Sequence, residues 1–195
     1  PERYRTYSPP APYLQKNNRS RWASTLEGSR SGAGAAATWM SNRVMGLNRE
    51  GYGRLLEKGL EARERMRDAI AERLPHAIFA APSDLNILCF CLPRSGERIS
   101  EVNARSERIF AAFESSTEFS ISRTTLDGNA YARLIALVRL QRDLIEDEKH
   151  LLMLRLVLMN PFVISKEAET DFVDAFVREL GSYDAGHVRE QKVPG

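Results

Sequence analysis

The sequence is poor in cysteine and lysine, and it contains no long hydrophobic run. Two of its 195 residues are cysteine, and only five of its 28 basic residues are lysine. Because no stretch of about 20 apolar residues is present, the sequence predicts no transmembrane helix. No signal peptide is visible either. Basic and acidic residues nearly balance, at net charge +2, which argues against an extended nucleic-acid-binding surface.

The few residues with metal-binding or redox chemistry do not form a recognisable site. Cys89 and Cys91 lie two apart in an apolar run, so we expect both on one face of a buried strand. Their Cα atoms would then be about 6.5–7 Å apart, at the far edge of disulfide geometry. His76, His150 and His187 show no ligand spacing around them. Two reduced thiols in a cytosolic protein are the expected arrangement.

Common sequence motifs for nucleotide binding and hydrolysis are also absent. The sequence has no GxGxxG, Walker loop, GxSxG or HExxH. Apolar residues nevertheless make up 43% of the chain, which is enough for a globular core.

Hydrophobic spacing and turn residues predict an α/β fold. We expect helices over 30–45, ended by Gly46, over 49–74, capped by Asn48, and over 99–114. Strands are expected over 77–80, 86–92, 118–125 and 151–159, with further helix inside 130–150. A last helix should begin at Ser165 and bury one apolar stripe: Phe172, Val173, Phe176, Val177 and Leu180. This order suggests a small antiparallel sheet with helices packed on one face.

One arginine interrupts the most apolar segment of the chain. Arg155 lies at the middle of residues 151–159, which are otherwise leucine, methionine and valine. On a strand, the leucines at 152, 154, 156 and 158 share one face, and Arg155 lies on the other with Met153, Val157 and Met159. An arginine keeps its charge and is costly to bury alone. It must therefore reach water, pair with an internal carboxylate, or bind an anionic ligand.

A second segment has the features of an anion-binding helix start. Gly28 and Ser29 resemble a turn and an N-cap, and small residues follow them up to Thr38. Free backbone N–H groups and the positive dipole end favour an anion at such a terminus. A capped helix that packs closely through its alanines explains the same residues without any ligand.

Read together, these segments resemble a known enzyme family. The resemblance rests on three runs in order: Leu26-Glu27-Gly28-Ser29-Arg30, then Gly51-Tyr52, then Leu154-Arg155-Leu156-Val157-Leu158-Met159-Asn160-Pro161. The family is the pyridoxal-phosphate-dependent group II amino-acid decarboxylases. The residues in these runs are most similar to the bacterial tyrosine decarboxylase and glutamate decarboxylase branch. The resemblance spans about residues 20–182.

The resemblance implies roles for particular residues. In the family, the serine that matches Ser29, beside Gly28, reaches the phosphate of pyridoxal 5'-phosphate in the neighbouring subunit of a homodimer. The arginine that matches Arg155 binds the α-carboxylate of the L-amino-acid substrate. The family's Schiff-base lysine follows a histidine, and no His-Lys pair occurs in this chain. No catalytic residue is therefore assigned here.

The resemblance also implies that the chain is the C-terminal part of such an enzyme. Residues 1–24 would be extended, 25–74 the end of the large domain with a long linking helix, 75–182 a small α/β domain, and 183–195 a polar tail. The upstream part could be truncated, a separate subunit or lost. Tyrosine or another aromatic amino acid is the preferred substrate, before glutamate or aspartate. The alternative function is a non-catalytic module that binds a small ligand or a partner.

Overall fold

The computed structural model describes residues 32–81, 83–165 and 169–186. The chain divides into two compact units, Pro1–Leu47 and Asn48–Gly195, and each is considered by itself. In the first unit, helix α2 spans Ala33–Met45 and none of its residues is buried. It ends at Gly46, whose φ of 75° only glycine adopts without strain. The helix predicted up to Gly46 is confirmed.

The second unit contains all the strands described. A π-helical turn η2 (Arg49–Gly53) leads into helix α3 (Arg54–Arg73), and the Asn48 side chain caps the turn by accepting from the Gly51 N–H. The remaining elements follow in the order β1 (Ile78–Phe79), β2 (Ile87–Cys91), α4 (Ile99–Glu114), β3 (Ser122–Leu126), α5 (Ala132–Arg142), β4 (Leu151–Val157) and α6 (Phe172–Asp184). Within the described residues, no helix has the length and apolar character needed to cross a membrane.

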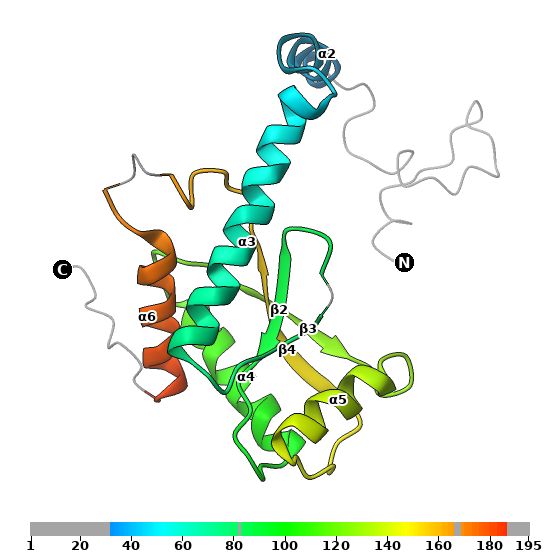
Figure 1. Ribbon diagram of the computed structural model, residues 1–195, viewed down its shortest axis with the longest axis vertical. Helices are drawn as coiled ribbons and strands as arrows, with labels where there is room; N and C mark the ends of the chain where they lie inside the picture. The colour runs from blue at the N-terminus through cyan, green and yellow to red at the C-terminus, as the bar shows by residue number, and fades with distance from the viewer. Residues whose placement is uncertain (1–31, 82, 166–168, 187–195) are drawn as a thin grey trace, which may run out of the picture. The chain divides into compact units, whose positions relative to one another are not determined.

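The four strands form one antiparallel sheet in the order β1-β2-β4-β3. Figure 1 labels β2, β4 and β3 of this sheet. Strand β4 is therefore internal and pairs with β2 on one side and β3 on the other. The predicted antiparallel sheet is confirmed. Because side chains alternate along each strand, β4 contributes to a separate core on each face of the sheet.

The larger core lies between one face of the sheet and helices α3, α4 and α6. Leu154, Leu156 and Leu158 contribute the leucine face that the alternation predicted. Helix α6 adds the rest of the predicted stripe, although Phe172 is 41% exposed, whereas Val173, Phe176, Val177 and Leu180 are buried. Aromatic rings fill the centre, with Phe113 stacked on Phe176 at 5.3 Å between centroids.

A smaller core covers part of the opposite face, which corrects the expectation that helices would lie on one face alone. Helix α5 contributes Ile135 and Val138, which cluster with Met153 of β4 and Cys91 of β2. The sequence of residues 130–150 did not indicate on which face of the sheet α5 packs, because α5 is only weakly amphipathic and its connection to β4 is short. The prediction that Cys89 and Cys91 share one face is confirmed, and both thiols are free.

Helix α6 differs from the prediction at both ends. It begins at Phe172 rather than Ser165, because Asp171 caps it by accepting from the N–H groups of Val173 and Asp174. It also continues to Asp184, past the point where the polar tail was expected, since Tyr183 and Asp184 are buried. The helix over 99–114 and the strand beginning at Leu151 are confirmed, whereas that strand ends at Val157 rather than at residue 159.

Two helical glycines provide a test of the packing between α3 and the sheet. A Cβ at Gly59 would lie 2.9 Å from the Leu158 carbonyl oxygen, which is backbone, whereas a Cβ at Gly181 would meet only Leu74 Cδ2 at 3.9 Å. We therefore expect Gly59→Ala to destabilise the fold by about 1–3 kcal/mol. Gly181→Ala, the matched control, should stabilise it by up to about 1 kcal/mol through helix propensity. Urea denaturation measures both, and equal effects would contradict this packing.

Candidate functional site

Arg155 lies at the centre of the sheet. It occupies the middle of β4, directly opposite Cys89 of β2 and Ser122 of β3. Its backbone position is therefore fixed by hydrogen bonding on both sides of the strand, and the sheet brings together three polar or polarisable side chains that are far apart in the sequence.

Arg155 is on the face predicted for it, opposite the leucine face. Met153 of the same face is fully buried beneath α5, whereas Val157, also on that face, is 40% exposed. Arg155 lies between them and is partly exposed. The guanidinium therefore occupies the boundary between the covered and uncovered parts of this sheet face, where a charged group can meet a ligand or water.

The contacts of Arg155 bear on the three alternatives for its charge. Its Nε donates to Ser122 Oγ at 2.9 Å, and Ser122 Oγ donates to the Arg155 carbonyl oxygen at 3.0 Å. Within the described ranges, no carboxylate forms an ion pair with this guanidinium. An internal carboxylate partner is therefore not found among those residues, and within them the terminal nitrogens of Arg155 are available to water or to an anionic ligand.

The thiols beside Arg155 are not activated. Burial raises the pKa of Cys89, although the positive charge of Arg155 opposes this shift. Burial also raises the pKa of Cys91 to about 12. Both thiols are therefore protonated at neutral pH and are poor nucleophiles. Among the described residues, no group of three or more His, Cys, Asp or Glu side chains is placed to hold a metal ion.

The other predicted site residues, Gly28 and Ser29, lie outside the described residues. Of the five lysines, Lys58 on α3 and Lys149 before β4 are described, and both are exposed.

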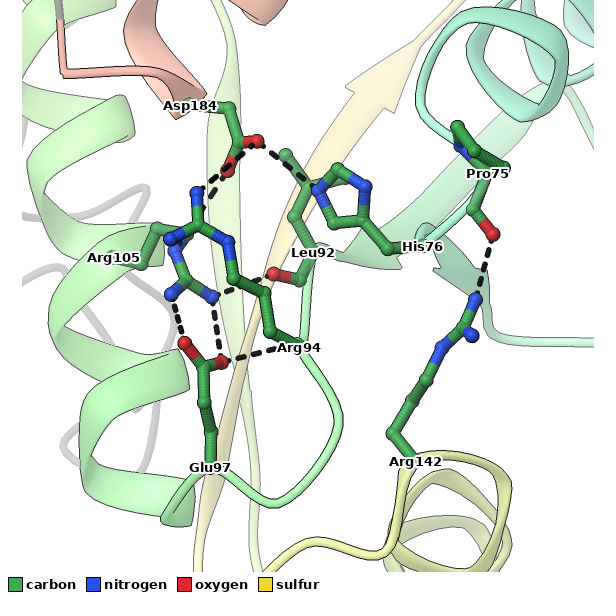
Figure 2. Close-up of polar contacts among 8 residues, drawn as sticks. All are labelled: Pro75, His76, Leu92, Arg94, Glu97, Arg105, Arg142 and Asp184. Atoms are coloured by element: carbon green, nitrogen blue, oxygen red, sulfur yellow. Dashed lines mark hydrogen bonds and ion pairs between the residues drawn. The ribbon is translucent and has the colours of Figure 1, made fainter.

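A buried ionic cluster, not anticipated from the sequence, lies at the end of α6 (Figure 2). Arg105 of α4 forms a two-pronged ion pair with Glu97 and donates to the Leu92 carbonyl oxygen at 2.8 Å. Arg105 retains only 8% side-chain exposure. Its hydrogen bond and charge lower the pKa of Glu97. The cluster therefore ties α4 to the loop that follows β2.

Asp184, the last residue of α6, joins the same cluster. Its carboxylate lies 3.1 Å from His76 Nε2 and 3.7 Å from Arg105 Nε. Burial alone would raise the pKa of Asp184, but the hydrogen bond with His76 and the charges of His76, Arg94 and Arg105 lower it below its usual range. This arrangement holds the C-terminal end of α6 against α4 and has the character of a structural ion cluster.

One sequence signal for this cluster was available. Arg105 follows Val102 by three residues and precedes Ile109 by four, so it lies on the apolar stripe of its helix. A buried arginine at such a position is costly unless its charge is paired. Asp184 could not be identified as a neighbour from the sequence, because it is distant along the chain.

The cluster predicts a strong dependence of stability on Arg105. Arg105→Met removes the cation that pairs with the partly buried Glu97 and lies beside the buried Asp184, and should lower the free energy of unfolding by on the order of 3 kcal/mol at neutral pH. The matched control is Arg67→Met, which removes a surface ion pair with Glu64 and Asp68 and should change stability very little.

Acid should reduce the effect of Arg105→Met. Because the folded pKa values of Glu97 and Asp184 lie below the unfolded values, their contribution is fully present above the unfolded pKa of about 4 and is lost as the pH falls further. Thermal unfolding of wild type and variant at a series of pH values measures this. A difference that stays constant down to pH 2 would contradict the cluster's role.

The chain was also compared with known proteins. No protein-family model matches it. It is 28% identical to an L-tyrosine decarboxylase of Enterococcus faecium, over a 159-residue alignment that covers 71% of this chain and 26% of that protein. It is 39% identical over 85 residues to a probable L-tyrosine/L-aspartate decarboxylase of Methanothermobacter thermautotrophicus, which covers 44% of this chain and 21% of that protein.

The chain thus spans about a quarter of the length of the first relative and about a fifth of the second. Tyrosine decarboxylases belong to the pyridoxal-phosphate-dependent decarboxylases, so the similarity supports a decarboxylase-related function. The chain therefore has distant, partial homologues within that family.

Proposed function

We propose that this chain is the C-terminal portion of a pyridoxal-phosphate-dependent amino-acid decarboxylase, and that Arg155 binds the α-carboxylate of the substrate. The observation that supports this most is the guanidinium of Arg155, which lies in an apolar strand with a serine hydroxyl and no described carboxylate as its partner. The similarity to two decarboxylases supports the same proposal.

The contribution of Arg155 is to bind and orient. Two N–H-bearing nitrogens of a guanidinium match the two oxygens of a carboxylate, so the contact fixes the direction of the substrate as well as its distance. Orientation of the bond between Cα and the carboxylate is the requirement that decarboxylation places on the protein. The rigid, internal strand β4 gives Arg155 a fixed backbone from which to do this.

The described residues do not fit pyridoxal 5'-phosphate by themselves. A covalent link to the cofactor requires a lysine in a sheltered site, and both described lysines, Lys58 and Lys149, are exposed. The proposal therefore assigns cofactor binding to an upstream part of the enzyme and to a second subunit. Ser29 and Gly28 are proposed to contact the cofactor phosphate of that second subunit, in line with the family resemblance.

The proposed substrate is an L-amino acid, with tyrosine or another aromatic amino acid preferred over glutamate or aspartate. The first relative is an L-tyrosine decarboxylase, and the second is a probable L-tyrosine/L-aspartate decarboxylase. The proposed contact of Arg155 does not select among these amino acids, because it concerns only the α-carboxylate that all of them share.

A non-catalytic module that binds a small ligand or a partner is the second candidate. The observation that favours it is the lack of a His-Lys pair anywhere in the 195 residues. The upstream coding sequence distinguishes the decarboxylase from the non-catalytic module, because a decarboxylase requires an in-frame His-Lys pair there.

The first prediction from this proposal is that the chain alone does not decarboxylate amino acids. The purified 195-residue chain is incubated with pyridoxal phosphate and L-tyrosine, L-glutamate or L-aspartate, and CO₂ release is followed. We expect no release above that of the free cofactor, because no suitable lysine is present. Turnover above that background would show that one of the five lysines binds the cofactor covalently, and would contradict the prediction.

The second prediction concerns Arg155 in the complete enzyme. Arg155→Met should preserve the fold and cofactor binding but lower kcat/KM. The loss of transition-state stabilisation should be about 3–5 kcal/mol, because a desolvated charge pair loses one partner. Amines that lack the α-carboxylate should bind wild type and variant equally. The matched control is Arg123→Met, which removes a guanidinium from β3 that lies over Phe110 and should leave kcat/KM unchanged.

A purely structural role for Arg155 gives a different result. In that case Arg155→Met lowers the melting temperature, and the affinities for amines and for amino acids fall together. Measurement of the melting temperature and both affinities on the one variant therefore decides between the two roles.

A further inference from the structure

Among the described residues, the guanidinium of Arg155 is hydrogen-bonded at one nitrogen and has no partner at the other two. Its Nε donates to Ser122 Oγ at 2.9 Å. In the portion of the chain that the structure describes, no hydrogen bond or ion pair involves Nη1 or Nη2. These two nitrogens form the end-on edge of the guanidinium, which can bind both oxygens of one carboxylate.

Ser122 uses its single hydroxyl twice on the same residue. It accepts from Arg155 Nε and donates to the Arg155 carbonyl oxygen at 3.0 Å. Because a hydroxyl carries only one proton, the bond to the carbonyl directs that proton to the backbone and turns a lone pair toward Nε. The two bonds thereby link the side chain of Arg155 to its own main chain through the neighbouring strand.

The sheet makes this link possible and rigid. Ser122 and Arg155 are direct cross-strand partners in the ladder between β3 and β4, although 33 residues separate them. A long arginine side chain loses much rotamer freedom when it binds a ligand. Since Ser122 already restricts Arg155 before a ligand arrives, that loss is smaller, and binding is correspondingly tighter.

The bond to Ser122 also selects which edge of the guanidinium is available. Side-on binding of a carboxylate uses Nε together with one terminal nitrogen, and Ser122 already occupies Nε. End-on binding through Nη1 and Nη2 is then the two-pronged geometry that remains. The hydroxyl thus determines the direction from which a carboxylate approaches the sheet.

We propose that Ser122 is a positioning residue that presents the end-on edge of Arg155 to the α-carboxylate of the substrate. The proposal rests on the proposed function of Arg155 as a carboxylate-binding residue and adds the group that orients it. Ser122 acts through Arg155 and does not itself contact the substrate.

The test uses the complete enzyme and acetate as the minimal carboxylate. Acetate is titrated into the isotopically labelled enzyme, and the NMR shifts of the backbone amides of β3 and β4 give its dissociation constant. Ser122→Ala should weaken acetate binding about threefold to tenfold, the size of effect expected for one hydrogen bond. The Arg155 Nε–H should also exchange faster with water in this variant.

Two variants serve as matched controls. Ser122→Thr keeps the hydroxyl and should bind acetate within about twofold of wild type. Thr124→Val removes a hydroxyl from the same face of the same strand, opposite Met153, and should also leave binding unchanged. If Ser122→Ala instead lowers the melting temperature while the dissociation constant is unchanged, Ser122 is only structural and the proposal is overturned.

Arg155→Met separates this proposal from the proposed function. It should abolish the saturable acetate response. If Arg155→Met abolishes the response while Ser122→Ala binds acetate like wild type, the role proposed for Ser122 is wrong, and Arg155 still binds the carboxylate. If Arg155→Met binds acetate like wild type, or if wild type shows no saturable response, both proposals are overturned.

Discussion

The structure depends most on the hydrogen bonding of β4 between its two neighbours. Antiparallel ladders to β2 and β3 fix the register of this strand on both sides. That register places the leucines against α3, α4 and α6, and Arg155 on the opposite face. A slip of one residue would bury the guanidinium in the leucine core. The ladder that builds the core therefore also positions the candidate site.

Two arginines of the fold show how burial distinguishes structure from function. Arg105 is almost fully buried and is surrounded by acceptors: the Glu97 carboxylate, the Leu92 carbonyl and, farther off, Asp184. Arg155 is partly exposed and has a serine hydroxyl and no carboxylate among the described residues. The first arrangement satisfies a charge inside the protein. The second leaves a charged edge available, and this contrast is the physical basis for treating Arg155 as a binding residue.

The sequence predicted what depends on local pattern. Alternation along β4 predicted the face of Arg155, and helical spacing predicted the apolar stripe of α6. The start of α6 was misplaced, because Ser165 and Asp171 are both able to cap a helix and only the tertiary packing selects one. The partners Ser122 and Asp184 could not be predicted, since each meets its arginine through contacts between residues distant in sequence.

The central claim is that the end-on edge of Arg155 binds the substrate carboxylate. The most direct measurement is a crystal structure of the complete enzyme with a bound, unreactive amino-acid analogue. We expect both carboxylate oxygens of the analogue at about 2.7–2.9 Å from Nη1 and Nη2 of Arg155, with Ser122 still bonded to Nε. A structure in which a protein carboxylate occupies that edge, and the analogue's carboxylate binds elsewhere, would contradict the claim.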